Sequence, residues 1–191
     1  FIDTTFIFTE PPLLIVESEY ENLLCYGDSN AFINIEITGG SPGYTYDWTG
    51  TIYNGTTYSS TNQDLDNLFA GDYTVIVTDT NNCSESISIQ ITQPDSLLIN
   101  STVSESLCDY NISCFGDTTG FINLDISGAT PQYTYEWYVD LDGDGNYDDL
   151  NADDVIDILD VYSSNEDISG LSAGIYSVFI QDANNCIDSL I

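Results

Sequence analysis

The chain has 191 residues, of which 32 are Asp or Glu, and it contains no Lys, Arg or His, so its formal net charge at pH 7 is −32. Without cationic side chains it lacks the groups that hold phosphates, contact nucleic acid or attract an anionic membrane surface, and it has no apolar run long enough for membrane insertion. Catalysis through a histidine base or a lysine Schiff base is excluded as well, whereas 42% hydrophobic and 13% aromatic residues suffice for a folded core.

Residues 1–12 are predicted to be the last strand of a preceding repeat. The heptapeptide TFIFTEP, which ends at Pro11, resembles SIQITQP, which ends at Pro94. The same comparison indicates that a later repeat stops at Ile191 before its own last strand, so we expect the chain to cut across a repeat array at both ends.

Residues 13–95 are predicted to form the first repeat, whose sequence pattern indicates a series of short strands. Three of them carry an apolar stripe at a period of two residues, with polar residues or turns between. These stripes, which we interpret as core in preference to a sugar-binding platform, are Ile33, Ile35 and Ile37; Tyr44, Tyr46 and Trp48; and Tyr73, Val75 and Val77.

Residues 96–191 are predicted to form a second repeat. Residues 25–48 correspond to 114–137 at an offset of 89, and residues 68–83 correspond to 171–186 at an offset of 103, so the second copy has an insertion of 14 residues. Only a short stretch at 153–161 has any helical period, and short strands with a Trp in a middle strand are typical of an immunoglobulin-like sandwich. We therefore predict an all-β fold of tandem immunoglobulin-like (PKD/fibronectin-III-like) β-sandwich repeats.

Five cysteines without any histidine favour disulfides in an oxidising compartment over metal binding or thiol catalysis. The simplest pairing joins Cys25 to Cys83 and Cys114 to Cys186 within each copy. In a sandwich, however, those positions lie at opposite ends of a strand, roughly 25 Å apart, whereas a disulfide needs Cα atoms within about 7 Å. The alternative is a bridge between copies, from Cys25 to Cys186. Cys108 is predicted to be free or to close a small loop with Cys114.

The insertion contains an acidic loop, DLDGDGNYDDLNADD at 140–154, that resembles a calcium-binding loop. Alternate carboxylates converge on one ion in such loops, and a glycine after the third permits a sharp turn. The twelfth position, Asn151, is not the usual bidentate Glu, so a later carboxylate would complete the site without a pair of flanking helices. Calcium is the expected ion, in a structural role, and its candidate ligands are Asp140, Asp142, Asp144, Asn146, Asp148, Asp149 and Asp153, with Asp154 as a further choice.

Two kinds of short motif are candidate glycosylation sites. Asn-x-Ser/Thr triplets, which are common by chance in a chain of this composition, occur at Asn54, Asn82, Asn100 and Asn111. The O-linked pattern, Asp followed by Ser or Thr and then by an apolar residue or Thr, predicts modification at Thr4, Ser96, Thr118 and Ser189.

Four motifs recur in the same order in both copies: C-x-G-x-x-x-G/A-x-I, P-x-Y-T-Y-x-W, L-x-A-G-x-Y-x-V and D-x-N-N-C. Together they resemble the SprB-type repeat of the gliding-motility adhesins of Bacteroidetes, over nearly the whole chain, with the insertion and Cys108 as departures. The resemblance implies a cell-surface filament that is exported by the type IX secretion system and moved by the gliding machinery. The same repeat also occurs in other large secreted proteins of that phylum.

We therefore expect no enzyme, since no pair of carboxylates stands out as acid and base and no deep cleft is indicated. The expected function is that of a non-enzymatic segment of an extracellular adhesin filament on the bacterial surface, in which Pro94 leads almost directly into the next strand and neighbouring repeats stack. Its partners would be those repeats and a substratum such as surface polysaccharide. The alternative is a carbohydrate-binding or spacer module of a secreted enzyme.

Overall fold

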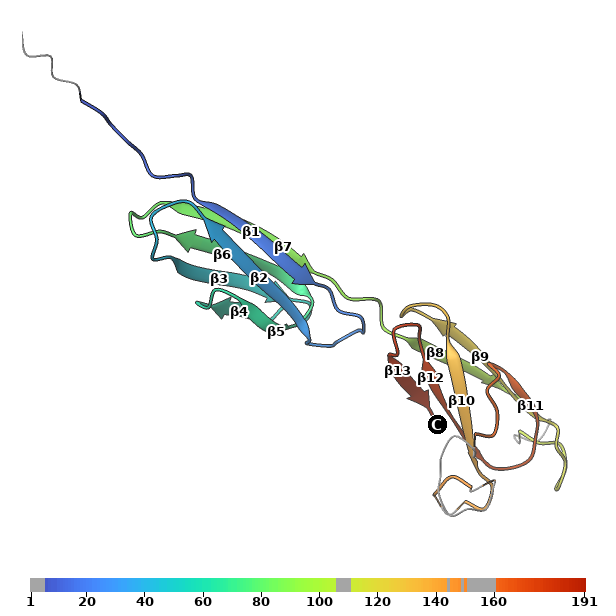
Figure 1. The fold of residues 1–191 in the computed structure, drawn as a ribbon. Helices are drawn as coiled ribbons and strands as arrows, with labels where there is room; N and C mark the ends of the chain where they lie inside the picture. The colour runs from blue at the N-terminus through green and yellow to red at the C-terminus, as the bar shows by residue number, and fades with distance from the viewer. Residues whose placement is uncertain (1–5, 106–110, 144, 149, 151–160) are drawn as a thin grey trace, which may run out of the picture. The chain divides into compact units, whose positions relative to one another are not determined.

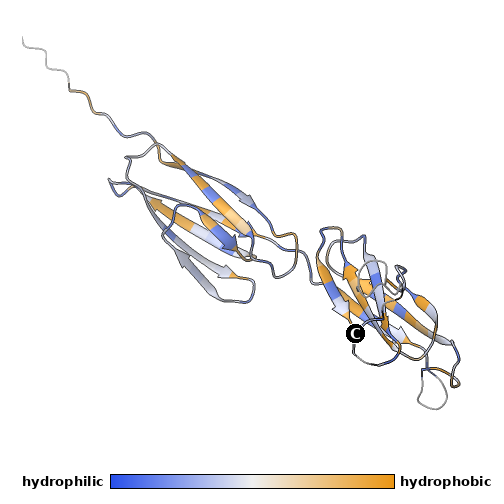
Figure 2. Ribbon diagram, turned by 60° about the horizontal axis from the view of Figure 1, so that its bottom comes forward, coloured by the Kyte–Doolittle hydropathy of each residue, from blue (hydrophilic) through white to orange (hydrophobic). Residues whose placement is uncertain are grey.

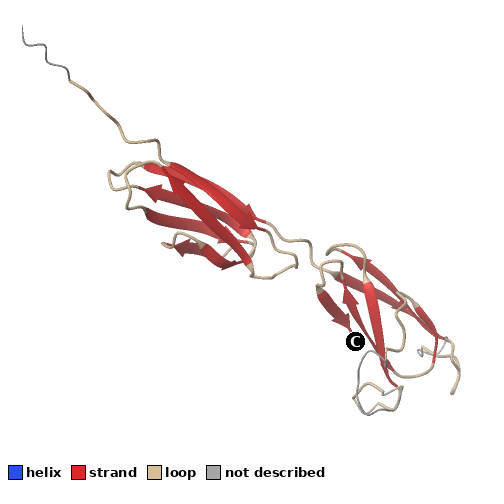
Figure 3. Cartoon of the chain, viewed as in Figure 1, coloured by secondary structure: helices blue, strands red, loops and turns tan. Residues whose placement is uncertain are grey.

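Antiparallel strands, without a helix, make up the fold of the described residues, which are 6–105, 111–143, 145–148, 150 and 161–191 of a computed structural model (Figures 1 and 3). Two compact units divide the chain, residues 1–93 (unit 1) and 94–191 (unit 2). Within the described part, no helix offers an apolar membrane span. The predicted all-β class is confirmed.

Unit 1 is a sandwich of two sheets, ordered β1-β2-β5 and β4-β3-β6-β7, with all pairs antiparallel. This is the arrangement of an immunoglobulin-like domain whose fourth strand has joined the second sheet. Its strands are β1 (Ile15–Glu21), β2 (Ala31–Thr38), β3 (Thr45–Ile52), β4 (Thr57–Ser60), β5 (Leu65–Leu68), β6 (Gly71–Thr78) and β7 (Ser84–Ile91).

Unit 2 repeats the two sheets, as β8-β9-β11 and β10-β12-β13. Among the described residues, the counterpart of β4 is a single bridge between Trp137 and Ser163. Its strands are β8 (Leu98–Val103), β9 (Gly120–Ser127), β10 (Thr134–Asp140), β11 (Ile168–Leu171), β12 (Ile175–Gln181) and β13 (Ile187–Leu190).

The predicted apolar stripes lie along strands of unit 1 in which apolar residues alternate with polar ones (Figure 2), and most of their residues are buried, whereas three are half-buried: Ile37, Tyr44 and Tyr46. Trp48 and Trp137 are almost fully buried, and each indole N–H donates a hydrogen bond to a backbone carbonyl, that of Asn62 at 2.9 Å and that of Asn165 at 2.8 Å. The interpretation of the stripes as core is confirmed for their buried residues, which are Ile33, Ile35, Trp48, Tyr73, Val75 and Val77.

The motif L-x-A-G-x-Y-x-V turns the chain between sheets. Tyr73, which is 1% exposed, donates its hydroxyl hydrogen to the carbonyl oxygen of Phe69 at 2.9 Å, and Tyr176 does the same to Ser172 at 3.2 Å. This is the tyrosine corner of immunoglobulin-like domains. Burial, followed by the nearby Tyr58, raises the pKa of Tyr73 to about 12.

The structure differs from the sequence-based expectation at the start of the chain and between the two repeats. Residues 6–14 form no strand, and six residues, 92–97, separate β7 from β8. The stretch 153–161 lies outside the described residues except for Val161.

Candidate functional site

The insertion lengthens one hairpin of unit 2. In unit 1 a tight turn joins β3 to β4, where the backbone N–H of Ile52 donates to the carbonyl oxygen of Thr56 at 2.9 Å. In unit 2 the chain leaves the sheet after β10 and rejoins it where the N–H of Trp137 donates to the carbonyl oxygen of Ser163 at 2.9 Å. The acidic loop therefore replaces a short turn at one end of the sandwich.

Asp140 organises the first part of this loop. Its side chain is 4% exposed, and its two carboxylate oxygens accept hydrogen bonds from the backbone N–H groups of Gly143, at 2.6 Å, and Gly145, at 3.0 Å. Both glycines have positive φ angles, 76° and 90°, which other residues adopt with difficulty. Gly145, the glycine expected after the third carboxylate of a calcium loop, thus lies with Gly143 in a turn of the backbone around the first carboxylate.

Asp148 closes the same turn from the other side. Its Oδ2 accepts a hydrogen bond from the N–H of Leu141 at 2.8 Å, while its own N–H donates to the carbonyl oxygen of Val139 at 2.8 Å. Asp140 and Asp148 are thereby held at the base of the loop.

The predicted calcium ligands are only partly described. Asp140, Asp142, Asn146 and Asp148 belong to the described residues, whereas Asp144, Asp149, Asp153 and the further choice Asp154 lie outside them. Within the described part of the loop and of the chain, no three His, Cys, Asp or Glu side chains are grouped closely enough to hold a metal ion. The calcium site stays a prediction.

An aromatic cluster that sequence reasoning missed anchors the loop to the sheet. Tyr147 of the loop stacks on Tyr138 of β10, with ring centroids 5.1 Å apart, and each of these rings is roughly perpendicular to that of Phe179 on β12, at centroid distances of 6.5 Å for Tyr147 and 5.7 Å for Tyr138. At the two strand positions unit 1 has Thr49 and Ile76. The unit with the insertion therefore carries aromatic residues under it, a difference that comparison of the two copies could have revealed.

The aspartate of each D-x-N-N-C motif fastens one turn to another. Asp79 is 4% exposed and accepts three backbone N–H hydrogen bonds, from Ser41 at 2.9 Å, Asn81 at 2.9 Å and Cys83 at 2.8 Å. The bond from Ser41 is the largest cause that lowers the pKa of Asp79, and those from Cys83 and Asn81 add to it against the opposing effect of burial.

Asp182 repeats this arrangement in unit 2. It accepts hydrogen bonds from the N–H groups of Thr130 at 3.0 Å, Asn184 at 2.8 Å and Cys186 at 2.9 Å. Burial acts to raise the pKa of Asp182, but the three hydrogen bonds outweigh it and the pKa is lowered. These acids stabilise turns, a role that the sequence alone did not assign to them.

The cysteines separate into two groups. Cys25 and Cys186 are disulfide-bonded, whereas Cys83 and Cys114 are free and exposed, so neither predicted pairing within a copy is formed. Pairing of Cys25 with Cys186 stays a prediction, and Cys108 lies outside the described residues.

The geometry of unit 1 explains why Cys25 does not pair with Cys83. Cys83 precedes β7, whereas the loop that holds Cys25 is fastened beyond the other end of β7, where the N–H of Leu23 donates to the carbonyl oxygen of Thr92 at 2.9 Å. Eight residues of extended strand span roughly 26 Å. That is several times the distance that a disulfide bridges.

The candidate glycosylation residues are mostly accessible. Ser96 is half-buried, and Thr4 lies outside the described residues. The exposed candidates are Asn54, Asn82, Asn100, Asn111, Thr118 and Ser189. Modification at any of them stays a prediction.

Among solved structures, the three N-terminal domains of the bacteriophage RB49 highly immunogenic outer capsid protein (Hoc) align with a TM-score of 0.44 and 17% identity, over 93% of this chain and 57% of that one. The C-terminal 282-residue fragment of intimin, in complex with the intimin-binding domain of the translocated intimin receptor, aligns with a TM-score of 0.41 and 12% identity, over 91% of this chain and 61% of that one. The chain thus spans about three fifths of the length of each. A search of curated proteins finds no match.

The family model of the SprB repeat matches residues 18–51 and 110–140. These segments hold the first two recurring motifs of each copy, together with the buried Trp48 and Trp137. The chain therefore contains two segments that are similar to the SprB repeat, one in each unit.

Proposed function

We propose that the chain is a non-enzymatic segment of a giant repetitive cell-surface adhesin filament that serves gliding motility and surface attachment. The observation that carries this proposal is that the recurring polar residues serve the fold in both copies. Asp79 and Asp182 fasten turns, Tyr73 and Tyr176 form corners, and the tryptophans bond to backbone carbonyls. What the two SprB repeats share is thus a scaffold, which suits a module that is copied many times along a fibre.

The location is tested on the organism that makes the protein. Antiserum against the 191-residue chain should label intact, unpermeabilised cells, and brief protease treatment of those cells should remove the label. Beads coated with the antibody should travel along the cell if the filament serves gliding. Labelling that requires permeabilised cells would contradict the surface location, and surface label without bead movement would contradict the gliding role alone.

We also propose that calcium binds the acidic loop and stiffens unit 2. The support is the arrangement of its described residues, in which Asp140 and Asp148 are held at the base of the loop and glycines wind the chain around Asp140. Several carboxylate and carbonyl oxygens in one loop suit Ca²⁺ better than Mg²⁺, which demands near-ideal octahedral geometry. Thermal unfolding at constant ionic strength should show a higher midpoint with Ca²⁺ than with Mg²⁺ or a chelator. Equal midpoints in all three would contradict the site.

A disulfide between Cys25 and Cys186 is the third part of the proposal. It is supported by the disulfide-bonded state of these two residues and by the free thiols of Cys83 and Cys114. Digestion without reductant, followed by mass spectrometry, should recover a peptide pair that contains Cys25 and Cys186. Recovery of Cys25 linked to any other cysteine would contradict it.

One observation favours the alternative of a carbohydrate-binding module. The stacked pair of Tyr138 and Tyr147 is only half-buried, and aromatic rings at a surface offer a face to sugars. A glycan array probed with the chain, and with the Tyr147→Ala variant as control, tests this. Binding that the variant loses would favour the carbohydrate-binding module.

A further inference from the structure

Two tyrosines of unit 2 lie with their ring faces against each other. Tyr138 of β10 and Tyr147 of the acidic loop have ring centroids 5.1 Å apart, and their planes are inclined by only 27°. Both residues are half-buried, so solvent reaches the pair. The other tyrosine pairs in contact among the described residues meet edge to face, at centroid distances of 5.2, 5.6 and 6.0 Å.

The stacked pair is held from below and from the side. The ring of Phe179 on β12 is roughly perpendicular to both tyrosine rings, at centroid distances of 5.7 Å from Tyr138 and 6.5 Å from Tyr147. Asp148, which follows Tyr147, donates its backbone N–H to the carbonyl oxygen of Val139, which follows Tyr138, at 2.8 Å. The sheet and the base of the loop therefore keep the two phenols together.

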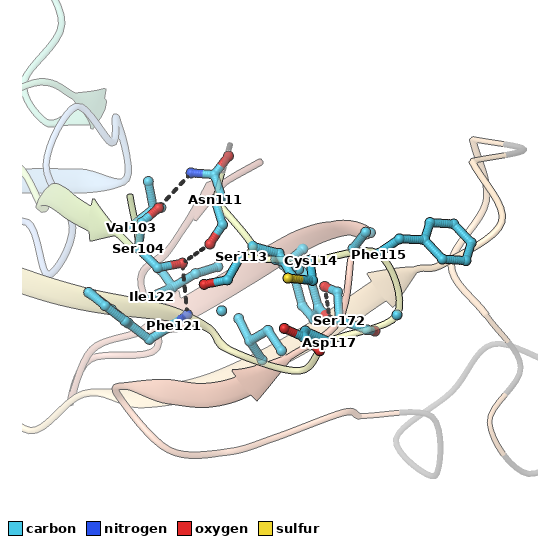
Figure 4. Close-up of a pocket in the computed structure, with 17 residues that line it drawn as sticks. Val103, Ser104, Asn111, Ser113, Cys114, Phe115, Asp117, Phe121, Ile122 and Ser172 are labelled. Carbon is cyan, nitrogen blue, oxygen red and sulfur yellow. Dashed lines mark hydrogen bonds between the residues drawn. The ribbon is translucent and has the colours of Figure 1, made fainter. Parts of the chain in front are cut away.

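The described residues offer few other accessible targets to an oxidant. The chain has no Met and no His, and Trp48 and Trp137 are 0% and 1% exposed. The thiols of Cys83 and Cys114 are exposed, and Cys114 lines a pocket of about 980 Å³ in unit 2 (Figure 4). Cys and Met are the side chains that oxidise most readily. Once the exposed thiols are blocked, accessible phenols are the main targets that remain.

One-electron oxidation of a phenol releases its hydroxyl proton and leaves a phenoxyl radical, whose unpaired electron is spread over the oxygen and the ring. In Tyr138 this proton has an acceptor at hand, because the hydroxyl donates a hydrogen bond to Oε2 of Glu136 at 3.4 Å. Two such radicals combine by forming a bond between an ε carbon of each ring. The hydrogens on these two carbons then move to the oxygens, which restores both phenols.

The geometry of a ring pair decides how readily this bond forms. It begins between orbitals that stand perpendicular to the ring planes, and these point toward each other in a stack but not where one ring meets another with its edge. Groups already held in a reactive arrangement combine far faster than groups that must first meet. The stacked pair of Tyr138 and Tyr147 is therefore prepared for coupling.

A second tyrosine pair provides a comparison within the same chain. Tyr26 and Tyr53 of unit 1 are more accessible, at 51% and 46% exposed, but their rings are 6.0 Å apart and inclined by 66°. If exposure alone decided, these two would couple first. If the stack decides, Tyr138 and Tyr147 couple first.

We propose that Tyr138 and Tyr147 are a site of oxidative crosslinking, at which a haem peroxidase using hydrogen peroxide joins them as dityrosine. The two phenols together give up two electrons and two protons, and the bond between their ε carbons forms. One molecule of hydrogen peroxide takes up these electrons and protons and leaves as two molecules of water.

The crosslink closes a covalent ring over residues 138–147, which hold three of the candidate calcium ligands, Asp140, Asp142 and Asn146. It fastens the acidic loop to β10 through a carbon–carbon bond, which reductants do not break, and it restricts the unfolded chain as a disulfide does. The inference concerns side chains of this chain alone, and it depends neither on the proposed cell-surface location nor on calcium binding.

The first test oxidises the folded protein with peroxidase and hydrogen peroxide. Cys83, Cys108 and Cys114 are replaced by serine, so that none of these thiols consumes the oxidant, and the protein is kept dilute so that copies rarely meet. We expect the blue fluorescence of dityrosine in a chain that stays monomeric and becomes lighter by two hydrogen atoms. Coupling that occurs only between chains would overturn the proposal.

Peptide mapping identifies the bond. A protease that cuts before aspartate separates the two tyrosines, because Asp140, Asp142 and Asp144 lie between them. Oxidised protein should yield a linked pair of peptides, one with Tyr138 and one with Tyr147. Failure to find this pair in fluorescent, monomeric protein would overturn the proposal.

Phenylalanine variants are the matched controls, because they remove a phenol and keep a ring that stacks. Tyr147→Phe should lower the yield of dityrosine within one chain at least about tenfold, whereas Tyr53→Phe should leave it unchanged. A yield that persists in Tyr147→Phe would contradict the assignment. So would a linked pair of Tyr26 and Tyr53 that forms in equal or greater amount.

A last experiment separates the fold from nearness in sequence, since nine positions separate Tyr138 from Tyr147. Photo-oxidation with ruthenium tris(bipyridine) and persulfate, which needs no enzyme, is applied to the folded chain and to the chain in concentrated urea. The bond between these two tyrosines should dominate in the folded chain and be one of several products in urea. The same distribution of products in both states would overturn the proposal.

Discussion

Single acidic side chains stabilise turns in this protein, which has no Lys, Arg or His side chain to pair with them. Asp79 is stabilised as a carboxylate by three backbone N–H groups, which lower its pKa below the ordinary value of 3.8. A carboxyl whose pKa is lowered by folding stabilises the fold above its ordinary pKa, and this contribution is lost as pH falls through the lowered value.

We therefore predict that Asp79→Asn lowers the unfolding midpoint of unit 1 at pH 7, and that the difference from the parent shrinks below about pH 4. An asparagine keeps one side-chain oxygen as an acceptor, but its NH₂ group replaces the other oxygen and faces one of the backbone N–H groups, so two donors meet. The measurement is thermal unfolding between pH 3 and 7. Asp47→Asn is the control, because Asp47 is exposed on β3 and its change removes the same charge. Equal effects of the two substitutions would show that net charge, and not the turn, is responsible.

The tyrosine corner gives a prediction at the opposite end of the pH scale. The raised pKa of Tyr73, about 12, means that its contribution is intact below pH 10 and is lost as pH rises toward 12. Tyr73→Phe should destabilise unit 1 by about 1 kcal/mol at pH 7, because the carbonyl of Phe69 loses its partner, and should flatten the fall in stability between pH 10 and 12. Tyr20→Phe, at a residue that is 47% exposed, should do neither. Urea unfolding at pH 7 and 11 checks both expectations.

At the scale of strands, the parts of the fold that depend on local patterning were predictable. Alternation of Ile33, Ile35 and Ile37 marks one strand without reference to any other, and the period-two stripe ending at Val77 marks another. The turn roles of Asp79 and Asp182 were not predictable in this way, since their partners Ser41 and Thr130 lie 38 and 52 residues away.

The lengthened hairpin of unit 2 provides a prediction at this scale. Replacement of residues 141–159 by the unit-1 turn Ile52–Thr56 should leave unit 2 folded, because the bonds from Trp137 to Ser163 and Asn165 that hold the hairpin base remain. The rise in midpoint with calcium should disappear in this variant. In the parent, calcium at a hundred times its dissociation constant is expected to add about 2.7 kcal/mol. If calcium still raises the midpoint of the variant, its binding site lies outside the loop.

At the scale of the whole molecule, the dominant fact is a formal charge of −32 without a compensating cation. The hairpin replacement also removes acidic residues, so a site-specific calcium effect must be distinguished from general screening. Repulsion among like charges opposes the compact state, and its range falls from about 30 Å at 0.01 M salt to about 10 Å at 0.1 M.

We predict that the unfolding midpoint rises by several degrees between 0.01 and 0.15 M NaCl and then levels off, because beyond that point the acidic side chains are already largely screened. Choline chloride should act equally at equal ionic strength, since screening depends on charge concentration and not on the identity of the ion. Calcium at millimolar concentration, added in 0.5 M NaCl, should then raise the midpoint further only if it occupies a site. An unfolding midpoint that does not change with NaCl would contradict this prediction. It would mean that the acidic side chains are too far apart, or too well hydrated, for their repulsion to oppose folding. In that case any rise of the midpoint with calcium could be attributed to binding at a site, because screening would not contribute to it.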